Sequence, residues 1–373
     1  MKKKVLISIA IILAIGLFGF KWSVADAQGT IPEIPVTGTG GVIGVIPVTG
    51  GGPIIDAGQG HTCMTSANGV LCWGLNSSGQ VGDGSTINRL KPVYVKNLAD
   101  VTTISLGSNH SCALLSDGTI WCWGKNGVGQ LGNETSTNSN VPVKVLGFPK
   151  KAVDLTSGNN FNCAVLEDNS IWCWGENTHG QLNDGTTKNQ LKAVKSTYPA
   201  APALISGGQT TVVGEASGYV SHWNNSSPTN ILGLSAASNI SGNRFNAGGC
   251  AVAGNNIVDC WAGDNKPAVI EKSDTARYVI AGYDFGCAVD LTNKVMCWGS
   301  NKFGQLGNGT NVDEKSAGYV PTLGAIADMG VGANHACVII TPTDVKCWGL
   351  NTFGQLGNNT VIDSNVPVQV ILP

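Results

Sequence analysis

The chain has 373 residues and a formal net charge of −2, and charged residues make up only 12% of it, about half the usual share. Because no basic run follows the first few residues, the sequence lacks the concentrated positive charge of a nucleic-acid-binding protein. Its 51 glycines, about double the usual share, favour an all-β protein with short strands and many tight turns.

The first 27 residues have the pattern of an export signal. Three lysines at positions 2–4 precede the apolar run Val5–Phe20, and Ala25–Ala27 supplies a cleavage site of the A-x-A kind. An uncleaved membrane anchor is the alternative, but the run is shorter than the roughly 18 to 20 residues that a spanning helix needs. We therefore expect residues 1–27 to be a signal peptide and the remaining chain to be secreted or located at the cell surface.

Residues 28–53 are rich in glycine, proline, valine and threonine, and the sequence IPVTG occurs twice, at Ile34–Gly38 and Ile46–Gly50. Proline and glycine at this spacing do not support a helix. A nucleotide-binding loop is disfavoured because no Gly-Lys-Ser/Thr follows the glycines. We expect this segment to be a linker.

From residue 54 onward, one motif recurs seven times. Its anchors, 37 to 51 residues apart, are Trp73, Trp123, Trp174, Trp223, Trp261, Trp298 and Trp348. The segment Thr119–Trp123 is apolar at nearly every position, whereas a half-buried strand would alternate apolar and polar residues. A radial blade requires this pattern because a neighbouring blade packs on each side. The sequence therefore predicts an all-β, seven-bladed β-propeller over residues 54–373.

The second repeat, Gly107–Gly132, reads G-x-x-H-x-C-A-L…D-G-x-x-x-C-W-G-x-N-x-x-G-Q-L-G, and this pattern resembles the regulator of chromosome condensation repeat. The resemblance extends from Ile54 to Leu372 and implies a seven-bladed propeller. The family includes exported bacterial members such as β-lactamase-inhibitor protein II, so inhibition of a β-lactamase is one function that the resemblance implies. This chain departs from the family pattern in its paired cysteines and in its shortened fourth and fifth repeats.

All twelve cysteines occupy the repeat register. They form six pairs: Cys63 with Cys72, Cys112 with Cys122, Cys163 with Cys173, Cys250 with Cys260, Cys287 with Cys297, and Cys337 with Cys347. The fourth repeat has Val212 and His222 at the aligned positions, so both members of a pair are absent together, as bonded cysteines predict. A three-residue turn ending in Gly118 would place the second pair opposite each other on a hairpin.

We therefore predict intra-blade disulfides, which the oxidising space outside the cell permits. Zinc ligation is disfavoured, because cysteines about ten residues apart do not form C-x-x-C knuckles.

No catalytic constellation can be assembled from one repeat. His61, His110 and His335 share one repeat position, which Phe161 and Phe285 occupy in the third and sixth repeats. An aromatic ring can replace packing but not proton transfer, so we interpret these histidines as structural, each with a hydrogen bond inside its own blade. We expect no catalytic residues, no metal ligands and no cofactor.

Trp121 and Trp172 are the candidate partner-binding residues, because they precede the second cysteine in adjacent repeats. The other repeats carry Leu71, Ser221, Asp259, Met296 and Lys346 at this position. Polar residues there indicate partial exposure, so the two tryptophans fit an aromatic hot spot. The alternative is that both fill a gap between the second and third blades.

A segment such as Gly299–Gly307 follows the anchor tryptophan in five repeats but is missing after Trp223 and Trp261. About ten residues of loop are absent from each of these two blades. We expect the fourth and fifth blades to have the lowest rim and to leave a notch on one side of the ring.

These features favour an exported, monomeric binding module that presents one end of a rigid propeller to a protein partner and is not an enzyme. The alternatives are a cell-surface scaffold tethered through residues 28–53 and a carbohydrate-processing enzyme. Guanine-nucleotide exchange, which the resemblance also implies, is disfavoured because an exported chain would not meet a nuclear GTPase. We expect no nucleic-acid partner and no membrane contact beyond the export signal.

Overall fold

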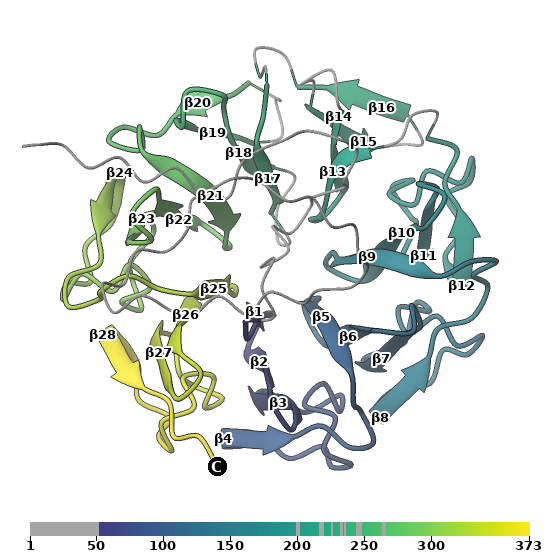
Figure 1. Ribbon diagram of the computed structural model, residues 1–373, viewed down its shortest axis with the longest axis horizontal. Coiled ribbons are helices and arrows are strands. Elements are labelled where there is room, and N and C mark those ends of the chain that lie inside the picture. The colour runs from purple at the N-terminus through teal and green to yellow at the C-terminus, as the bar shows by residue number, and fades with distance from the viewer. Residues whose placement is uncertain are drawn as a thin grey trace, which may run out of the picture. The chain divides into compact units, whose positions relative to one another are not determined.

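Seven four-stranded antiparallel sheets surround a central axis (Figure 1) in the computed structural model, which describes residues 52–198, 202–215, 220–224, 227–231, 234, 236–243, 248–262 and 266–373. Residues 1–51, with the predicted signal peptide and nearly all of the predicted linker, lie outside the described residues. In each sheet the strands follow chain order from the axis to the rim. The described residues contain no α-helix, and so none that could cross a membrane. The predicted seven-bladed propeller is confirmed.

Each blade consists of four consecutive strands. Blades 1 to 3 contain β1 (Ile55–Ala57), β2 (His61–Ser66), β3 (Gly69–Gly74), β4 (Arg89–Tyr94), β5 (Val101–Leu106), β6 (His110–Leu115), β7 (Ile120–Gly124), β8 (Ser139–Lys144), β9 (Ala152–Ser157), β10 (Phe161–Leu166), β11 (Ile171–Gly175) and β12 (Gln190–Lys195). Blades 4 and 5 contain β13 (Pro202–Gly207), β14 (Thr211–Glu215), β15 (Val220–Asn224), β16 (Ser227–Asn230), β17 (Asn239–Gly242), β18 (Gly249–Val252), β19 (Val258–Trp261) and β20 (Ala268–Val269). Blades 6 and 7 contain β21 (Ala276–Ala281), β22 (Phe285–Asp290), β23 (Val295–Gly299), β24 (Glu314–Tyr319), β25 (Asp328–Val331), β26 (His335–Thr341), β27 (Asp344–Gly349) and β28 (Ser364–Gln369).

The hydrophobic core lies between the blades, which explains why the strands are apolar on both faces. All six residues of β10 are buried. One cluster combines Cys112 and Leu131 of blade 2 with Leu155 and Trp174 of blade 3, and similar clusters join other neighbouring blades. Burial of one such side chain contributes about 1.5–3 kcal/mol. Each blade therefore depends on its neighbours for much of its stability.

Six disulfides join the second and third strands, one in each blade except blade 4. In blade 2, Cys112 lies opposite Cys122 across the hairpin. The turn requires Gly118, whose φ of 83° is in the left-handed region that glycine favours. In blade 4, Val212 lies opposite His222. The predicted intra-blade disulfides are confirmed.

A buried hydrogen bond connects adjacent blades through the loop that joins the third strand to the fourth. In five blades this loop has 14 residues, at 75–88, 125–138, 176–189, 300–313 and 350–363. In four of these blades, the backbone carbonyl of the loop glutamine accepts the indole N–H of the anchor tryptophan in the following blade, and we call this bond the tryptophan latch. The described residues form it between Trp123 and Gln80 (2.9 Å), Trp174 and Gln130 (3.1 Å), Trp348 and Gln305 (2.9 Å), and Trp73 and Gln355 (2.8 Å).

A buried asparagine gives each 14-residue loop its shape. In blade 2, Asn126 Oδ1 accepts the N–H of Leu131, and Asn126 Nδ2 donates to the carbonyl of Thr137. The equivalent residues in the other four blades, which also accept a loop N–H, are Asn76, Asn177, Asn301 and Asn351. Because Asn126 is fully buried, these bonds replace water and hold the loop in the position that the latch requires.

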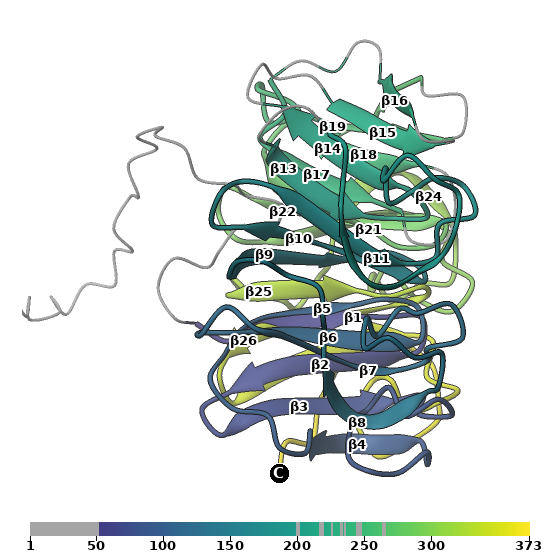
Figure 2. The same cartoon turned by 90° about the vertical axis from the view of Figure 1, so that its right-hand side faces the viewer.

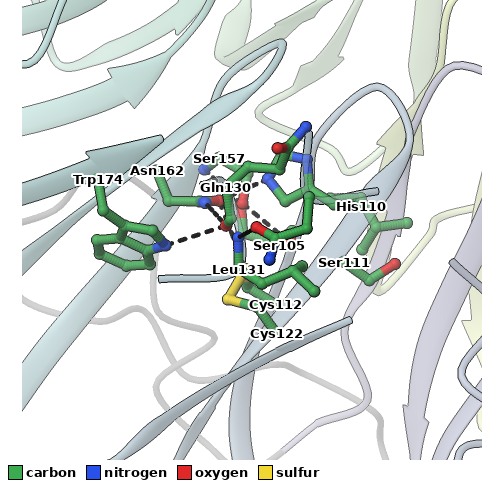
Figure 3. Close-up of a disulfide and its surroundings, with 12 residues drawn as sticks. Ser105, His110, Ser111, Cys112, Cys122, Gln130, Leu131, Ser157, Asn162 and Trp174 are labelled. Carbon is green, nitrogen blue, oxygen red and sulfur yellow. Dashed lines mark hydrogen bonds between the residues drawn. A yellow bond between two sulfur atoms is a disulfide. The ribbon is translucent and has the colours of Figure 1, made fainter. Parts of the chain in front are cut away.

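The histidines bind across the blade junction, so the prediction that they bond inside their own blade is wrong. Figure 3 shows the junction of blades 2 and 3, where His110 Nε2 lies 2.9 Å from Asn162 Oδ1. His61 likewise contacts Ser111, and His335 contacts Thr62, each at 2.9 Å. Successive residues of a strand point to opposite faces. Each histidine therefore shares the face of the cysteine two residues later and points to the next blade.

Blades 4 and 5 lack the 14-residue loop. Residues 225–226 and 262–267 connect their third and fourth strands. Within the part of the chain that the structure describes, the indole N–H of Trp261 is buried without an acceptor, and Trp298 makes no hydrogen bond. Two consecutive junctions are therefore closed without the tryptophan latch.

The ring closes without strand exchange, because every sheet is made of four consecutive strands. Blade 7 contacts blade 1 through side chains and loops. Asp328 Oδ2 accepts the N–H of Ile55 at 2.9 Å, and the latch of Trp73 and the His335–Thr62 bond lie at the same junction. Burial raises the pKa of Asp328 to about 7.

Replacing Trp348 with phenylalanine should lower the free energy of unfolding, because the buried carbonyl of Gln305 would lose its donor. Trp298→Phe is the matched control, since Trp298 donates no hydrogen bond but undergoes the same loss of ring volume. We expect the Trp348 variant to be less stable than the Trp298 variant by about 1–3 kcal/mol. Urea denaturation with the disulfides intact measures this difference, and equal losses would contradict the role of the latch.

Acid should destabilise the protein through His335. Burial lowers the pKa of this histidine from 6.5 to about 3, so the unfolded chain takes up a proton below pH 6.5 while the folded protein does not. The contribution of His335 to stability is complete above pH 6.5 and decreases as the pH falls toward 3. At pH 5 the loss amounts to about 2 kcal/mol.

The variant His335→Phe tests this effect, because Phe161 occupies the same position in blade 3. Asp328 acts in the opposite direction between pH 7 and pH 5, since a raised carboxyl pKa makes acidification stabilising. Asp328 is present in both proteins, so its effect cancels. The change in unfolding free energy between pH 7 and pH 5 should differ between the two proteins by about 2 kcal/mol. An identical pH dependence would show that His335 does not titrate in this way.

Candidate functional site

The strand order gives the propeller two chemically different ends. In blade 1, residues 58–60 and the 14-residue loop 75–88 lie at one end, whereas the hairpin turn 67–68 and the link 95–100 lie at the other. We call these the loop end and the hairpin end. Figure 2 shows the ring from its side, with the strands running between the two ends. A partner that binds one end cannot reach residues confined to the other.

The two candidate tryptophans lie near the hairpin end, in different junctions. Trp121 Nε1 donates to Thr119 Oγ1 at 3.2 Å, and Trp172 Nε1 donates to Ser170 Oγ at 3.0 Å, in each case within its own hairpin. Both indoles are half-buried. Trp121 packs against the core between blades 1 and 2, and Trp172 against the core between blades 2 and 3. They therefore do not fill one common gap, and a partner-binding role for them stays a prediction.

A hollow also opens at the hairpin end, beside the turn that precedes β7. Its volume is about 460 Å³, and residues 117–120 and 144–151 line it. Lys144, Lys150 and Lys151 are exposed around it, and Lys150 forms an ion pair of 3.5 Å with Asp168. Exposed ion pairs of this kind contribute little to stability.

The low rim expected for blades 4 and 5 stays a prediction. At the loop end, a hollow of about 220 Å³ lies between blades 5 and 6, where the 14-residue loop of blade 5 is missing, and we call this hollow the notch. Its walls are formed by Asn243, Cys260, Trp261, Tyr283, Phe285 and Trp298. In the latched blades, the glutamine loop covers the equivalent space over the tryptophan. The hollow forms where that loop is absent, and the aromatic residues of its wall, Trp261, Phe285 and Trp298, are only 5–6% exposed.

Two glycines that our sequence reasoning missed accompany the missing loops. Gly249 and Gly286 lie opposite Trp261 and Trp298, and a Cβ atom added to either would be 2.7 Å from the tryptophan Cζ2. The latched blades 1 to 3 have Thr62, Ser111 and Asn162 at this position. The indole in blades 5 and 6 therefore occupies the space of that side chain. The signal in the sequence is glycine at this position together with a shortened preceding repeat.

The notch is aromatic and almost uncharged. Asp284 is the one charged residue among the described residues that line it, and Asn243 Nδ2 donates to the carbonyl of Tyr283 at its edge. The buried donor of Trp261 costs about 1–3 kcal/mol while it has no acceptor. No cluster of three or more potential metal ligands occurs among the described residues. This surface is suited to bind an apolar group together with a hydrogen-bond acceptor.

The loop end also carries exposed aliphatic side chains on three adjacent blades. They are 55–73% exposed and comprise Val312 of blade 6, Val361 and Ile362 of blade 7, and Ile87 of blade 1. We call this set the apolar arc. Thr137 and Lys188 occupy the equivalent loop position in blades 2 and 3, so the arc is not a requirement of the repeat. We interpret these exposed aliphatic side chains as a candidate interaction surface.

Backbone hydrogen bonds hold the loops of the apolar arc on the next blade. The N–H of Gly309 donates to the carbonyl of Asn365 at 2.8 Å, and the N–H of Asn359 donates to that of Leu90 at 2.9 Å. The first bond joins the blade 6 loop to blade 7, and the second joins the blade 7 loop to blade 1. The exposed side chains therefore project from a fixed backbone.

Family models match more than half of the chain. Two models of the Regulator of chromosome condensation (RCC1) repeat match residues 54–80, 101–130, 152–181 and 279–305, and residues 68–114, 117–165, 293–339 and 345–373.

Similar proteins occur in animals and plants. The E3 ubiquitin-protein ligase HERC2 of Homo sapiens is 25% identical over 177 residues, which cover 47% of this chain and 4% of that protein. The ultraviolet-B receptor UVR8 of Arabidopsis thaliana is 28% identical over 180 residues, covering 45% of this chain and 39% of that protein. The chain thus aligns with 39% or less of the length of these relatives.

Solved structures with the same fold are more distant in sequence. Prp20p of Saccharomyces cerevisiae has a TM-score of 0.72 at 18% identity, over 82% of this chain and 87% of that chain. The CRINKLY WD40 ectodomain of the Arabidopsis thaliana receptor kinase ACR4 has a TM-score of 0.54 at 16% identity, over 86% of this chain and 98% of that chain. At these identities, the similarity shows the propeller fold alone.

The disulfide in the notch should be reduced before the others. Cys260 is half-buried and Cys250 is 6% exposed, whereas the cysteines of the remaining five bridges are at most 2% exposed. Because thiol attack requires access to a sulfur atom, brief treatment with a phosphine reductant should open Cys250–Cys260 about tenfold faster than Cys287–Cys297. Alkylation and peptide mapping measure both rates. Uniform reduction of all six bridges would contradict the open notch.

Proposed function

The chain belongs to the regulator of chromosome condensation repeat family, and we propose that it is an exported binding module that presents the loop end of its propeller to a protein partner, without catalysis. The observation that carries this proposal is the apolar arc on blades 6, 7 and 1. A rigid ring with variable, exposed loop residues is the usual arrangement of a recognition scaffold.

The class of partner is supported by related propellers. Prp20p of yeast binds Gsp1p and histones and forms a complex with Kap60. These are the partners of Prp20p. For this chain we propose only the same class of partner, a folded protein.

An extracytoplasmic location is supported by two observations. Six disulfides are typical of proteins that fold in an oxidising space. The similarity to a plant receptor ectodomain shows the same fold in an extracellular setting. The predicted signal peptide agrees with this location.

A pair of substitutions on the apolar arc tests the proposal. Val312→Asn together with Ile362→Asn removes two exposed apolar side chains while leaving the loop backbone unchanged. The matched control is Leu291→Asn at the hairpin end, because Leu291 is 59% exposed and lies outside the arc. Each purified chain is used as bait in its native surroundings, and captured proteins are cross-linked and quantified.

We expect the double variant to capture at least about tenfold less of a partner that the control and the unmodified chain retain equally. The melting temperatures of the three proteins should agree, since none of the changed side chains is buried. Loss of capture only in the Leu291 variant would place the binding surface at the hairpin end. Equal capture by all three proteins would overturn the role of the arc.

A further inference from the structure

We propose that the notch receives a tight turn of the protein partner, whose apolar side chain fills the hollow and whose backbone carbonyl accepts the indole N–H of Trp298. This inference rests on the proposed function and specifies where and by what chemistry the partner is held. The partner would supply the carbonyl acceptor and the aliphatic side chain that the loop of the preceding blade supplies at the latched junctions.

The latched junctions show which groups satisfy the indole N–H at this position of the repeat. Where blade 6 meets blade 7, Gln305 supplies the acceptor for Trp348, and the neighbouring Leu306 is 1% exposed in the core. Gly307 lies against the indole, so closely that a Cβ there would be 2.8 Å from Trp348 Nε1. The complementary ligand is therefore a turn of the type Gln-Leu-Gly, with a free carbonyl, one aliphatic side chain and no bulk beside the ring.

The dimensions and chemistry of the notch suit this ligand. A cavity of about 150 Å³ holds a benzene-sized group, and the notch has about 220 Å³. Trp298 is 94% buried, as its exposed fraction is 6%, yet it donates no hydrogen bond among the described residues. Phe285 and Trp261 supply the apolar walls against which an aliphatic side chain would pack.

The position of the notch agrees with the proposed binding surface. The notch borders blade 6, whose 14-residue loop carries Val312 of the apolar arc. Both features lie at the loop end. A partner covering blades 6, 7 and 1 would therefore have its edge beside Trp298, where one protruding turn could enter the hollow.

The probe for the test is a cyclised peptide with the sequence of residues 301–309, which contains the turn of blade 6. The protein is the full propeller with ¹⁵N-labelled tryptophan, and the indole N–H resonance of Trp298 is assigned from the Trp298→Phe variant. We expect this resonance to shift on titration and to saturate at about millimolar peptide, while the resonance of Trp348, whose acceptor is already in place, stays unchanged.

A control peptide and a loop graft make the result specific. Asparagine in place of the leucine in the peptide should weaken binding about tenfold, because the aliphatic group no longer fills the hollow. Replacing residues 262–267 of the protein with the sequence of residues 300–313 supplies the loop in cis and should abolish the shift. The same graft should reduce capture of the partner in the pull-down described above.

The inference is overturned if Trp298 does not respond to about 5 mM peptide, if the control peptide acts equally well, or if the graft leaves peptide binding intact. These outcomes leave the proposed function in place as long as substitutions in the apolar arc still reduce capture. Conversely, a response of Trp298 to the peptide together with arc variants that capture normally would retain the notch as a peptide site and reject the arc.

Discussion

The length, shape and sequence of the loops in this propeller depend on one repeated buried hydrogen bond, from a tryptophan indole to a glutamine carbonyl of the preceding blade. The indole N–H is removed from water, so the loss of its acceptor costs about 1–3 kcal/mol. The carbonyl of Gln305 depends on Trp348 in the same way, whereas the other three glutamine carbonyls also accept a side-chain hydrogen bond from the following blade. The carbonyl can reach the indole only if the loop has the correct length and shape. That requirement explains the repeated Gly-Gln-Leu-Gly sequence and the buried asparagine that holds each loop.

The tryptophan latch also determines which loop residues of the repeat must be kept and which can vary. Asn, Gln, Leu and Gly of the loop are buried and tied to the neighbouring blade, whereas the side chains at positions such as Ile87, Lys188 and Ile362 project into solvent. Recognition surfaces can therefore differ from blade to blade while the ring stays unchanged. Where the loop itself is lost, as in blade 5, the space of the latch becomes a hollow with aromatic walls.

Sequence reasoning predicted the features that follow from the repeat register. The seven anchor tryptophans led to seven blades, the joint replacement by Val212 and His222 led to the disulfide pairing, and the missing segment after Trp261 led us to expect a notch. Features that depend on contacts with the neighbouring blade were harder to predict from the sequence. The period of two places His110 on the face of Cys112, but it does not say which blade that face meets. For the same reason, the alternative that placed Trp121 and Trp172 in one gap between blades 2 and 3 is wrong, because they lie in two junctions.

The formation of every sheet from four consecutive strands also bears on how the correct cysteine pairing arises. Twelve cysteines admit roughly ten thousand pairings, by extension of the counts for smaller sets. Here each partner is only 9 or 10 residues away in sequence, and no strand has to arrive from a distant part of the chain. Closing so short a segment costs little entropy compared with joining distant repeats. Each correct pair therefore needs only its own hairpin, and a cysteine finds its partner without any contribution from a distant repeat.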